Sequence, residues 1–162
     1  MHALPALIGR ATFALESETL RAGIGLARAL SPGDIVFLEG ELGAGKSTLA
    51  RAVLRALGWN GPVRSPSYAL VHTYRMGALV AHHLDLYRVA SLDEALGLDL
   101  DRIFSPEAIC LVEWPDRLDG TVRPDWVVRL EIEGDGRNIE LRGPSRPGQE
   151  AILAPPNQEN DP

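Results

Sequence analysis

Gly40-Glu41-Leu42-Gly43-Ala44-Gly45-Lys46-Ser47 decides the fold of this chain, because it fits the phosphate-loop pattern G-x-x-x-x-G-K-[ST] at every fixed position. Residues 34–39 before it form a short apolar run, led in by Ser31-Pro32-Gly33, which is typical of a buried strand. Residues 47–57 after it carry apolar side chains at helical spacing and stop at Gly58. The motif requires a strand, a glycine-rich loop and a helix in this order, so this setting argues against a chance glycine-rich turn.

The residue types of the loop indicate its chemistry. The glycines allow successive backbone N–H groups to turn inward around phosphate oxygens, and the dipole at the start of the following helix also favours an anion. Lys46 is the one lysine among 16 lysine and arginine residues, and its compact ammonium suits the outer phosphates of a nucleotide. The Ser47 hydroxyl is expected to face a magnesium ion. The predicted nucleotide-binding residues of this segment are Glu41, Leu42, Gly43, Ala44, Gly45, Lys46, Ser47 and Thr48.

Length and composition limit the remaining possibilities. A chain of 162 residues is large enough for one domain with its own core. Its formal net charge of −6 argues against binding nucleic acid unaided, since phosphate backbones require clustered cations. No apolar stretch has the length of a transmembrane helix, and the first residues lack the basic leader of a secretion signal. We therefore expect a cytoplasmic protein with no membrane partner.

Cysteine and histidine residues do not predict a structural metal site. Cys110 is the only cysteine, which excludes a disulfide within the chain and favours a buried structural thiol. His82 and His83 are adjacent in a predicted strand, so their side chains should point to opposite faces of the sheet. A zinc site built on this pair is therefore a poor prediction.

The rest of the chain predicts an α/β protein. Strands are expected at residues 11–15, 34–39, 68–74, 78–84, 108–113, 126–132 and 137–141, and helices at 18–30, 47–57, 98–104 and just after the capping box Ser91-Leu92-Asp93-Glu94. Ser17 is the expected N-cap of the helix at 18–30. The turns at 75–77 and 134–136 indicate two hairpins.

Together these elements predict a three-layer sandwich of the P-loop NTPase type, with a mainly parallel central sheet and antiparallel additions. Residues 1–143 would form a single domain. Residues 144–162 are rich in Pro, Gly, Gln and Asn and are expected to form a flexible tail.

Three later clusters carry the oxygen ligands that magnesium and an attacking water would need. Arg64-Ser65-Pro66-Ser67-Tyr68 follows the helix of the phosphate loop, in the place where many such proteins have a nucleotide-sensing hydroxyl. His83-Leu84-Asp85-Leu86-Tyr87-Arg88 and Leu111-Val112-Glu113-Trp114-Pro115 each place a carboxylate at the end of a strand. The carboxyl ends of the strands are where α/β sheets bind ligands.

Each of these residues also has an ordinary structural interpretation. Ser67 suits a turn, Asp85 suits a cap for the segment that follows it, and Glu113 suits a solvated strand end. Trp114 on physical grounds alone favours packing over stacking on a nucleotide base. The residue types therefore leave both interpretations open at this stage.

Taken together, the phosphate loop and the Ser-Pro-Ser-Tyr, His-Leu-Asp-Leu-Tyr-Arg and Leu-Val-Glu-Trp-Pro motifs resemble the TsaE family. That family comprises bacterial ATPases needed for threonylcarbamoyladenosine formation at position 37 of tRNA. The resemblance runs in the right order from about Phe13 to Leu141. One departure is Ser67, where the family usually has threonine, and the hydroxyl is retained.

The resemblance implies a residue-level site. Its Mg²⁺ ligands would be Ser47, Ser67, Asp85 and Glu113, and its catalytic residues would be Lys46, Asp85 and Glu113. Trp114 would belong to the same pocket, and Glu16 would border the adenine. The family members dock on the TsaD–TsaB pair, and hydrolysis of ATP to ADP is thought to reset that enzyme. A slow ATPase that meets tRNA only through this complex is therefore implied.

Other nucleotide-binding classes remain as alternatives. A small-molecule P-loop kinase shares the loop and the size, but it would need an arginine-rich lid to clamp the transferred phosphate. A GTPase would need Asp-x-x-Gly and Asn-Lys-x-Asp, and the chain has neither, since Lys46 is its only lysine. A binding module without catalysis does not explain the clusters of carboxylates and hydroxyls.

Overall fold

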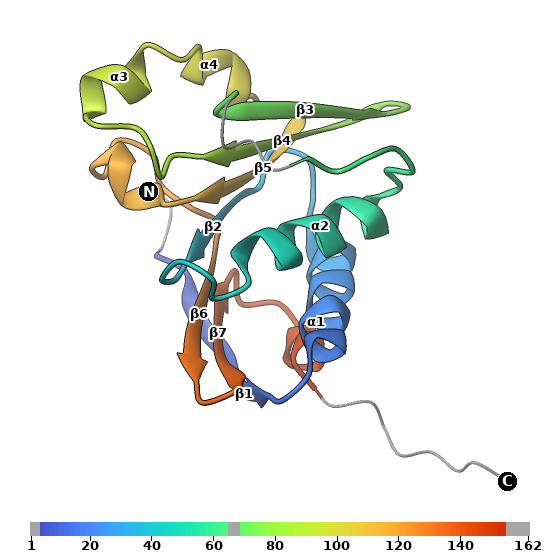
Figure 1. Cartoon of the computed structure of the whole chain (residues 1–162). Helices are drawn as coiled ribbons and strands as arrows, with labels where there is room; N and C mark the ends of the chain where they lie inside the picture. The colour runs from blue at the N-terminus through green and yellow to red at the C-terminus, as the bar shows by residue number, and fades with distance from the viewer. Residues whose placement is uncertain (1–3, 65–68, 155–162) are drawn as a thin grey trace, which may run out of the picture.

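A computed structural model describes residues 4–64 and 69–154 of the chain (Figure 1). The strands are β1 (Ala6–Phe13), β2 (Ile35–Glu39), β3 (Val71–Met76), β4 (Leu79–Asp85), β5 (Ala108–Glu113), β6 (Trp126–Glu133) and β7 (Gly136–Gly143). The helices are α1 (Glu16–Ala29), α2 (Lys46–Leu57), α3 (Leu92–Leu96) and α4 (Leu100–Ile103), with 3₁₀ turns η1 (Pro115–Leu118) and η2 (Gln149–Ile152).

The strands form one seven-stranded sheet in the order β1-β7-β6-β2-β5-β4-β3. Its centre is parallel, because β2 pairs in parallel with both β5 and β6, and β5 does so with β4. The remaining pairs, β1 with β7, β7 with β6 and β3 with β4, are antiparallel additions. This topology confirms the predicted α/β fold with a mainly parallel centre.

Two apolar layers cover the sheet. Helices α1 and α2 lie side by side on one face, where they bury Val36, Leu38, Leu111 and Trp126 (Figure 1). The opposite face beside β4 and β5 is covered by α3, α4 and η1, which bury a second cluster that includes Cys110. Within residues 4–64 and 69–154, no helix is long and apolar enough to cross a membrane.

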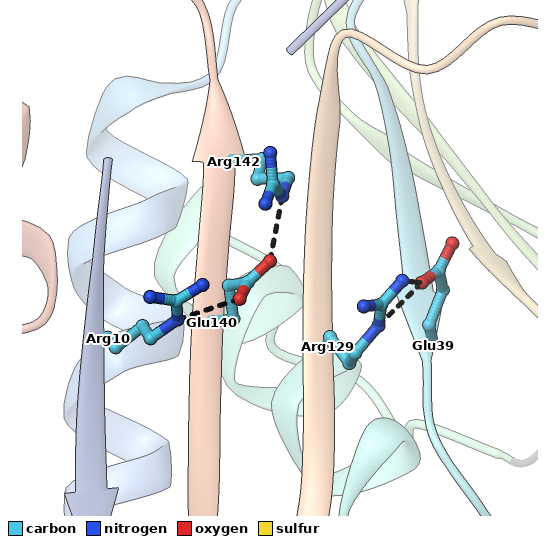
Figure 2. Close-up of polar contacts among 5 residues, drawn as sticks. All are labelled: Arg10, Glu39, Arg129, Glu140 and Arg142. Carbon is cyan, nitrogen blue, oxygen red and sulfur yellow. Dashed lines mark hydrogen bonds and ion pairs between the residues drawn. The ribbon is translucent and has the colours of Figure 1, made fainter. Parts of the chain in front are cut away.

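The outer half of the second face carries charged side chains (Figure 2). Arg10 on β1 and Arg142 on β7 both donate to Glu140, at 2.8 Å and 2.7 Å. Arg129 on β6 contacts Glu39 on β2 at 2.9 Å. The register places Arg10 opposite Glu140 and Arg129 opposite Glu39, so these two pairs join neighbouring strands, whereas Arg142 and Glu140 lie on the same strand. Exposed pairs of this kind contribute only about 0–1 kcal/mol each, so they mark a polar surface and contribute little to the core.

The start of the fold differs from its predicted boundaries. Strand β1 begins at Ala6 and ends at Phe13, and α1 begins at Glu16, so Ser17 lies inside the helix and is not its N-cap. The carboxylate of Glu18 accepts the backbone N–H groups of Ala14 and Leu15, both at 2.8 Å. A glutamate in the first turn therefore caps this helix from inside, which a search for an N-cap side chain overlooks.

The segment after β7 also differs from the expected loose tail in the part that is described, residues 144–154. Gln149–Ile152 forms η2 against α1, and Leu153 is only 8% exposed in the core beneath it. Ile152 packs against the same core. Two apolar residues are enough to dock this stretch, although its overall composition is polar. Residues 155–162 lie outside the described part.

Candidate phosphate-binding site

A cavity of about 510 Å³ opens where β2, β4 and β5 end at the same edge of the sheet. Its lining residues are Leu42, Gly43, Gly45, Lys46, Ser47, Thr48, Asp85, Tyr87, Arg88, Glu113 and Trp114. The loop after β2 supplies one wall, and the ends of β4 and β5 supply the two carboxylates. Asp85 and Glu113 are register partners of neighbouring parallel strands, so the sheet itself places them side by side.

The backbone geometry of the loop explains why it contains glycine at positions 40 and 45. Gly45 is the N-cap of α2 and has φ of 107°, a left-handed conformation that side chains disfavour. Gly40 has φ of 152°, and a Cβ atom there would lie 2.4 Å from the Leu130 carbonyl oxygen. Glycine is therefore required at both positions by the backbone conformation of the loop, and at Gly40 also by the close approach of Leu130.

Lys46 lies at the base of this loop and is 4% exposed. Its Nζ donates to the carbonyl oxygens of Gly40 at 2.7 Å and Glu41 at 2.9 Å, and it lies 4.4 Å from the centre of the Trp114 ring. Burial lowers the pKa of Lys46, while the negative charges of Glu113, Asp85 and Glu41 act in the opposite direction. The ammonium is thus held in place by loop carbonyls, which an incoming anion can replace.

Glu113 is the centre of a buried polar chain. Ser47 donates its hydroxyl to the two carboxylate oxygens, at 3.0 Å to Oε1 and 3.3 Å to Oε2. The Nε2 atom of His83 lies 2.8 Å from Oε1 of the same carboxylate. Glu113 is 3% exposed and His83 is 1% exposed. Glu113 is therefore not a solvated strand end, which was its ordinary structural interpretation.

Asp85 is less enclosed than Glu113. Its Oδ1 accepts the backbone N–H of Tyr87 at 3.1 Å, so it does cap the segment that follows β4, and it also lines the cavity. Burial raises the pKa of Asp85, and the neighbouring charge of Glu113 raises it further. The two interpretations that the sequence left open are therefore compatible at this residue.

The aromatic wall of the cavity is formed by Trp114 and Tyr87. Their ring centroids are 4.9 Å apart at an interplanar angle of 45°. Trp114 has φ of 57°, an uncommon conformation for a residue other than glycine. Its indole packs against both Tyr87 and the Lys46 ammonium. These contacts agree with a packing role for Trp114.

A second cavity, of about 290 Å³, lies on the other side of the loop. It is lined by Phe13, Ala14, Leu15, Glu16, Thr19, Gly43, Ala44, Gly45, Thr48, Asp135, Gly136 and Arg137. Glu16 from the start of α1 therefore lines this cavity together with residues of the loop. Gly43, Gly45 and Thr48 line both cavities, which makes the two spaces neighbours across the phosphate loop.

Arg137 is a contact residue that the sequence did not indicate. From the start of β7 its guanidinium donates to the carbonyl oxygens of Ala44 at 3.0 Å, Gly43 at 3.1 Å and Gly136 at 2.8 Å. Its fork therefore ties the terminal hairpin to the loop. Residues 93 and 94 positions apart are joined in this way, and no local spacing signals such a contact.

The donor set of the first cavity suits a hard cation such as Mg²⁺. Ser47, Asp85 and Glu113 offer hydroxyl and carboxylate oxygens, the ligand type that Mg²⁺ prefers, and Mg²⁺ normally takes only one or two carboxylates together with substrate phosphates and water. Ser67, the fourth predicted ligand, lies outside the described residues, as does the rest of 65–68. In the described ranges there is no group of three or more His, Cys, Asp and Glu residues placed to hold a metal.

The histidine and cysteine interpretations can be compared with the structure. Nδ1 of His82 lies 2.9 Å from the Thr73 hydroxyl, whereas His83 faces Glu113, so the pair does not converge on one site. Burial is the main reason that the pKa of His82 is lowered. Cys110 is buried, donates to the Ile103 carbonyl at 2.9 Å, and has its pKa raised by burial to about 12, which is typical of an inert structural thiol.

Comparison with known proteins gives a consistent result. The sequence model of the family "Threonylcarbamoyl adenosine biosynthesis protein TsaE" matches residues 13–141. The tRNA threonylcarbamoyladenosine biosynthesis protein TsaE of Haemophilus influenzae is 38% identical over 121 residues, covering 74% of this chain and 77% of that one. The protein of the same name from Rickettsia conorii is 34% identical, covering 78% and 71%. The crystal structure of Bacillus subtilis YdiB superposes with a TM-score of 0.72 at 26% identity and covers 88% of each chain.

Proposed function

Because the chain belongs to the TsaE family and so takes part in the biosynthesis of threonylcarbamoyladenosine in tRNA, we propose that it does so as a Mg²⁺-dependent ATPase. The observation that carries this proposal is the cavity in which Lys46, Ser47, Asp85 and Glu113 meet beside the phosphate loop. An ammonium, a hydroxyl and two carboxylates are the groups that phosphoryl transfer to water requires.

Binding of the triphosphate would begin with an exchange of partners at Lys46. The Nζ atom now satisfies the carbonyl oxygens of Gly40 and Glu41, at 2.7 Å and 2.9 Å. Phosphate oxygens replace these neutral acceptors with charged ones, so the Lys46 ammonium gains the attraction of an opposite charge. Burial of Lys46 strengthens this preference, because water screens the pair less.

Ser47, Asp85 and Glu113 would hold the magnesium ion, whose charge offsets that of the phosphates and helps to position them. Ser47 now donates its hydroxyl to Glu113, so it has to turn from the carboxylate to serve as a ligand. Glu113 then has an oxygen available to orient the attacking water. Asp85, fixed by the Tyr87 N–H, would stay beside Glu113 in the same cavity.

The second cavity would take the base and sugar. It adjoins the first one across Thr48, and Glu16 lies on its rim. We assign adenine to this side on the basis of its position next to the loop. A small-molecule kinase is the alternative for such a nucleotide site, and a kinase would transfer the phosphate to a metabolite acceptor, whereas the proposed ATPase transfers it to water.

Hydrolysis of ATP would act on the TsaD–TsaB complex. We propose that the chain docks on this pair in the cytoplasm in its ATP-bound form and that hydrolysis resets the pair between turnovers. Position 37 of tRNA would be reached only through the complex, since a net charge of −6 does not favour direct binding of nucleic acid. ATP favours the docked state only insofar as it binds that state more tightly.

Reconstitution with TsaD and TsaB from the same organism tests the proposed function. With the parent chain and Mg-ATP, we expect many rounds of tRNA modification, and without the chain we expect the reaction to stop near one round. The isolated chain should release phosphate from ATP slowly, with no acceptor metabolite present. Sustained modification without the chain, or phosphate transfer to a metabolite in place of water, would contradict this proposal.

Arg137 provides a separate test of the loop geometry. Arg137→Ala is expected to lower nucleotide affinity by roughly tenfold, because the Gly43 and Ala44 carbonyls lose a charged donor worth about 1.5 kcal/mol. Arg137→Lys should not restore it, since an ammonium cannot reproduce the fork. Calorimetric titration with Mg-ATP measures the effect, and Arg129→Ala, which removes an exposed arginine paired with Glu39, is the matched control. Equal affinity of the Arg137 and Arg129 variants would show that the contact does not shape the loop.

A further inference from the structure

His83 is a buried imidazole that the proposed mechanism has not yet used. It lies on β4 two residues before Asp85, so the two side chains project from the same face of the sheet. Its ring is 1% exposed, and Nε2 is 2.8 Å from Oε1 of Glu113, which is 3% exposed. The next residue, His82, points to the other face and contacts Thr73. His83 is therefore the histidine that shares the space of the candidate site.

The contacts of the two ring nitrogens indicate which of them carries the hydrogen. An ionised carboxylate only accepts hydrogen bonds, so the short contact to Glu113 requires a hydrogen on Nε2. The other nitrogen, Nδ1, is buried and has no hydrogen-bond partner in the described part of the chain. A hydrogen on Nδ1 would add a buried donor with no acceptor, so the contacts favour the tautomer with its hydrogen on Nε2. In this tautomer His83 is a fixed donor to the carboxylate.

We propose that His83 is the positioning residue of Glu113, an inference that rests on the proposed ATPase function. His83 donates to Oε1 and so fixes the plane of the carboxylate, while the Ser47 hydroxyl, which contacts both oxygens, is free to leave. The carboxylate then keeps one oxygen bound to the ring and turns the other toward the cavity.

The two carboxylates of the site are thereby held by different means. Asp85 is oriented by a backbone N–H from Tyr87. Among residues 4–64 and 69–154, no backbone N–H donates to the Glu113 side chain, and its side-chain donors there, Ser47 and His83, come from other elements. When Ser47 turns to a cation, His83 remains as the donor that prevents the Glu113 side chain from rotating. Donors that orient a ligating or catalytic carboxylate typically affect affinity or activity by 10- to 100-fold.

A matched pair of variants tests this role. His83→Gln places an amide N–H near the position of Nε2, whereas His83→Asn places one near Nδ1 and leaves Glu113 without its donor. We expect His83→Asn to lower kcat for ATP hydrolysis by about 10- to 100-fold with unchanged nucleotide affinity, and His83→Gln to retain most of the parent kcat. His82→Asn is the control, since that ring faces Thr73 on the other side of the sheet.

Further measurements separate a positioning role from a purely structural one. In a Glu113→Gln background, His83→Asn should cause no additional loss of kcat, because the group that it positions is already altered. Thermal unfolding of each variant shows whether it is folded. A long-range ¹H–¹⁵N spectrum of the parent chain should show the Nε2–H tautomer of His83, a result that depends on no variant and no activity.

The outcomes distinguish this inference from the proposed function. Absence of Mg-ATP hydrolysis by the parent chain, alone and with TsaD and TsaB, would overturn the proposed function and the role of His83 that rests on it. A parent chain that hydrolyses ATP together with an equally active His83→Asn variant would overturn only the role of His83. An Nδ1–H tautomer in the spectrum would overturn it as well.

Discussion

Replacing Lys46 by methionine is expected to lower the affinity for Mg-ATP by roughly 10- to 150-fold. The ammonium is buried at the base of the loop, 4% exposed, and is the chain's only lysine. The loss of a hydrogen bond between a charged donor and a charged acceptor costs about 1.5–3 kcal/mol, and each 1.4 kcal/mol is a factor of ten in affinity. Methionine keeps most of the length of the side chain and removes the charge, so the variant isolates the electrostatic contact.

Calorimetric titration with Mg-ATP measures this loss. Arg51→Met is the matched control, because Arg51 is an exposed cation on the same helix. Thermal unfolding without nucleotide shows whether removing the donor to the Gly40 and Glu41 carbonyls also loosens the loop. Equal affinity of parent and Lys46→Met would mean that this lysine is a structural brace for the loop carbonyls and not a phosphate ligand.

The centre of the fold could be predicted from local sequence because its elements have strong local signals. The run around Val36 and Leu38 and the run around Leu111 are continuous and apolar, which is typical of strands covered on both faces. The terminal hairpin could also be predicted, because the glycines at 134 and 136 are typical of a tight turn. Gly134 adopts φ of 57° in that turn, between β6 and β7. These signals depend on residues that are close in sequence.

The boundaries that differ depend on contacts that local patterns do not encode. Helix α1 begins before Ser17 because Glu18 reaches back to the N–H groups of Ala14 and Leu15. The stretch 144–154 docks because Leu153 finds the core beneath α1 and β1, although its neighbours are polar. In both cases one or two side chains outweigh the average composition of their segment.

The residues of the candidate site also divide into those that local sequence indicates and those that only contacts between distant segments place. Lys46, Ser47, Asp85 and Glu113 could be selected from motif and strand-end position, and the structure brings them to one cavity. Arg137 could not, because its contact with the loop depends on how β7 is placed in the sheet. His83 is indicated by its position, because it lies two residues before Asp85 in a strand and alternate residues share a face.

Glu113→Gln is expected to lower ATP hydrolysis by about 100-fold or more while nucleotide affinity stays close to that of the parent chain. Glutamine keeps the size of the side chain and its contacts with Ser47 and His83, but it removes the negative charge that would orient the attacking water. Asp85→Asn should have a comparable effect on hydrolysis, since Asp85 is the register neighbour of Glu113 and lines the same cavity.

Single-turnover hydrolysis and calorimetric binding of the two variants, measured together, separate catalysis from affinity for each carboxylate. Glu131→Gln is the control, because Glu131 is an exposed carboxylate on β6 outside this cavity. If either variant hydrolyses ATP at the parent rate, that carboxylate contributes to the shape of the cavity and has no catalytic part. If both lose nucleotide affinity and hydrolysis in equal measure, their role is confined to binding the metal–nucleotide complex, and a group other than Glu113 orients the water.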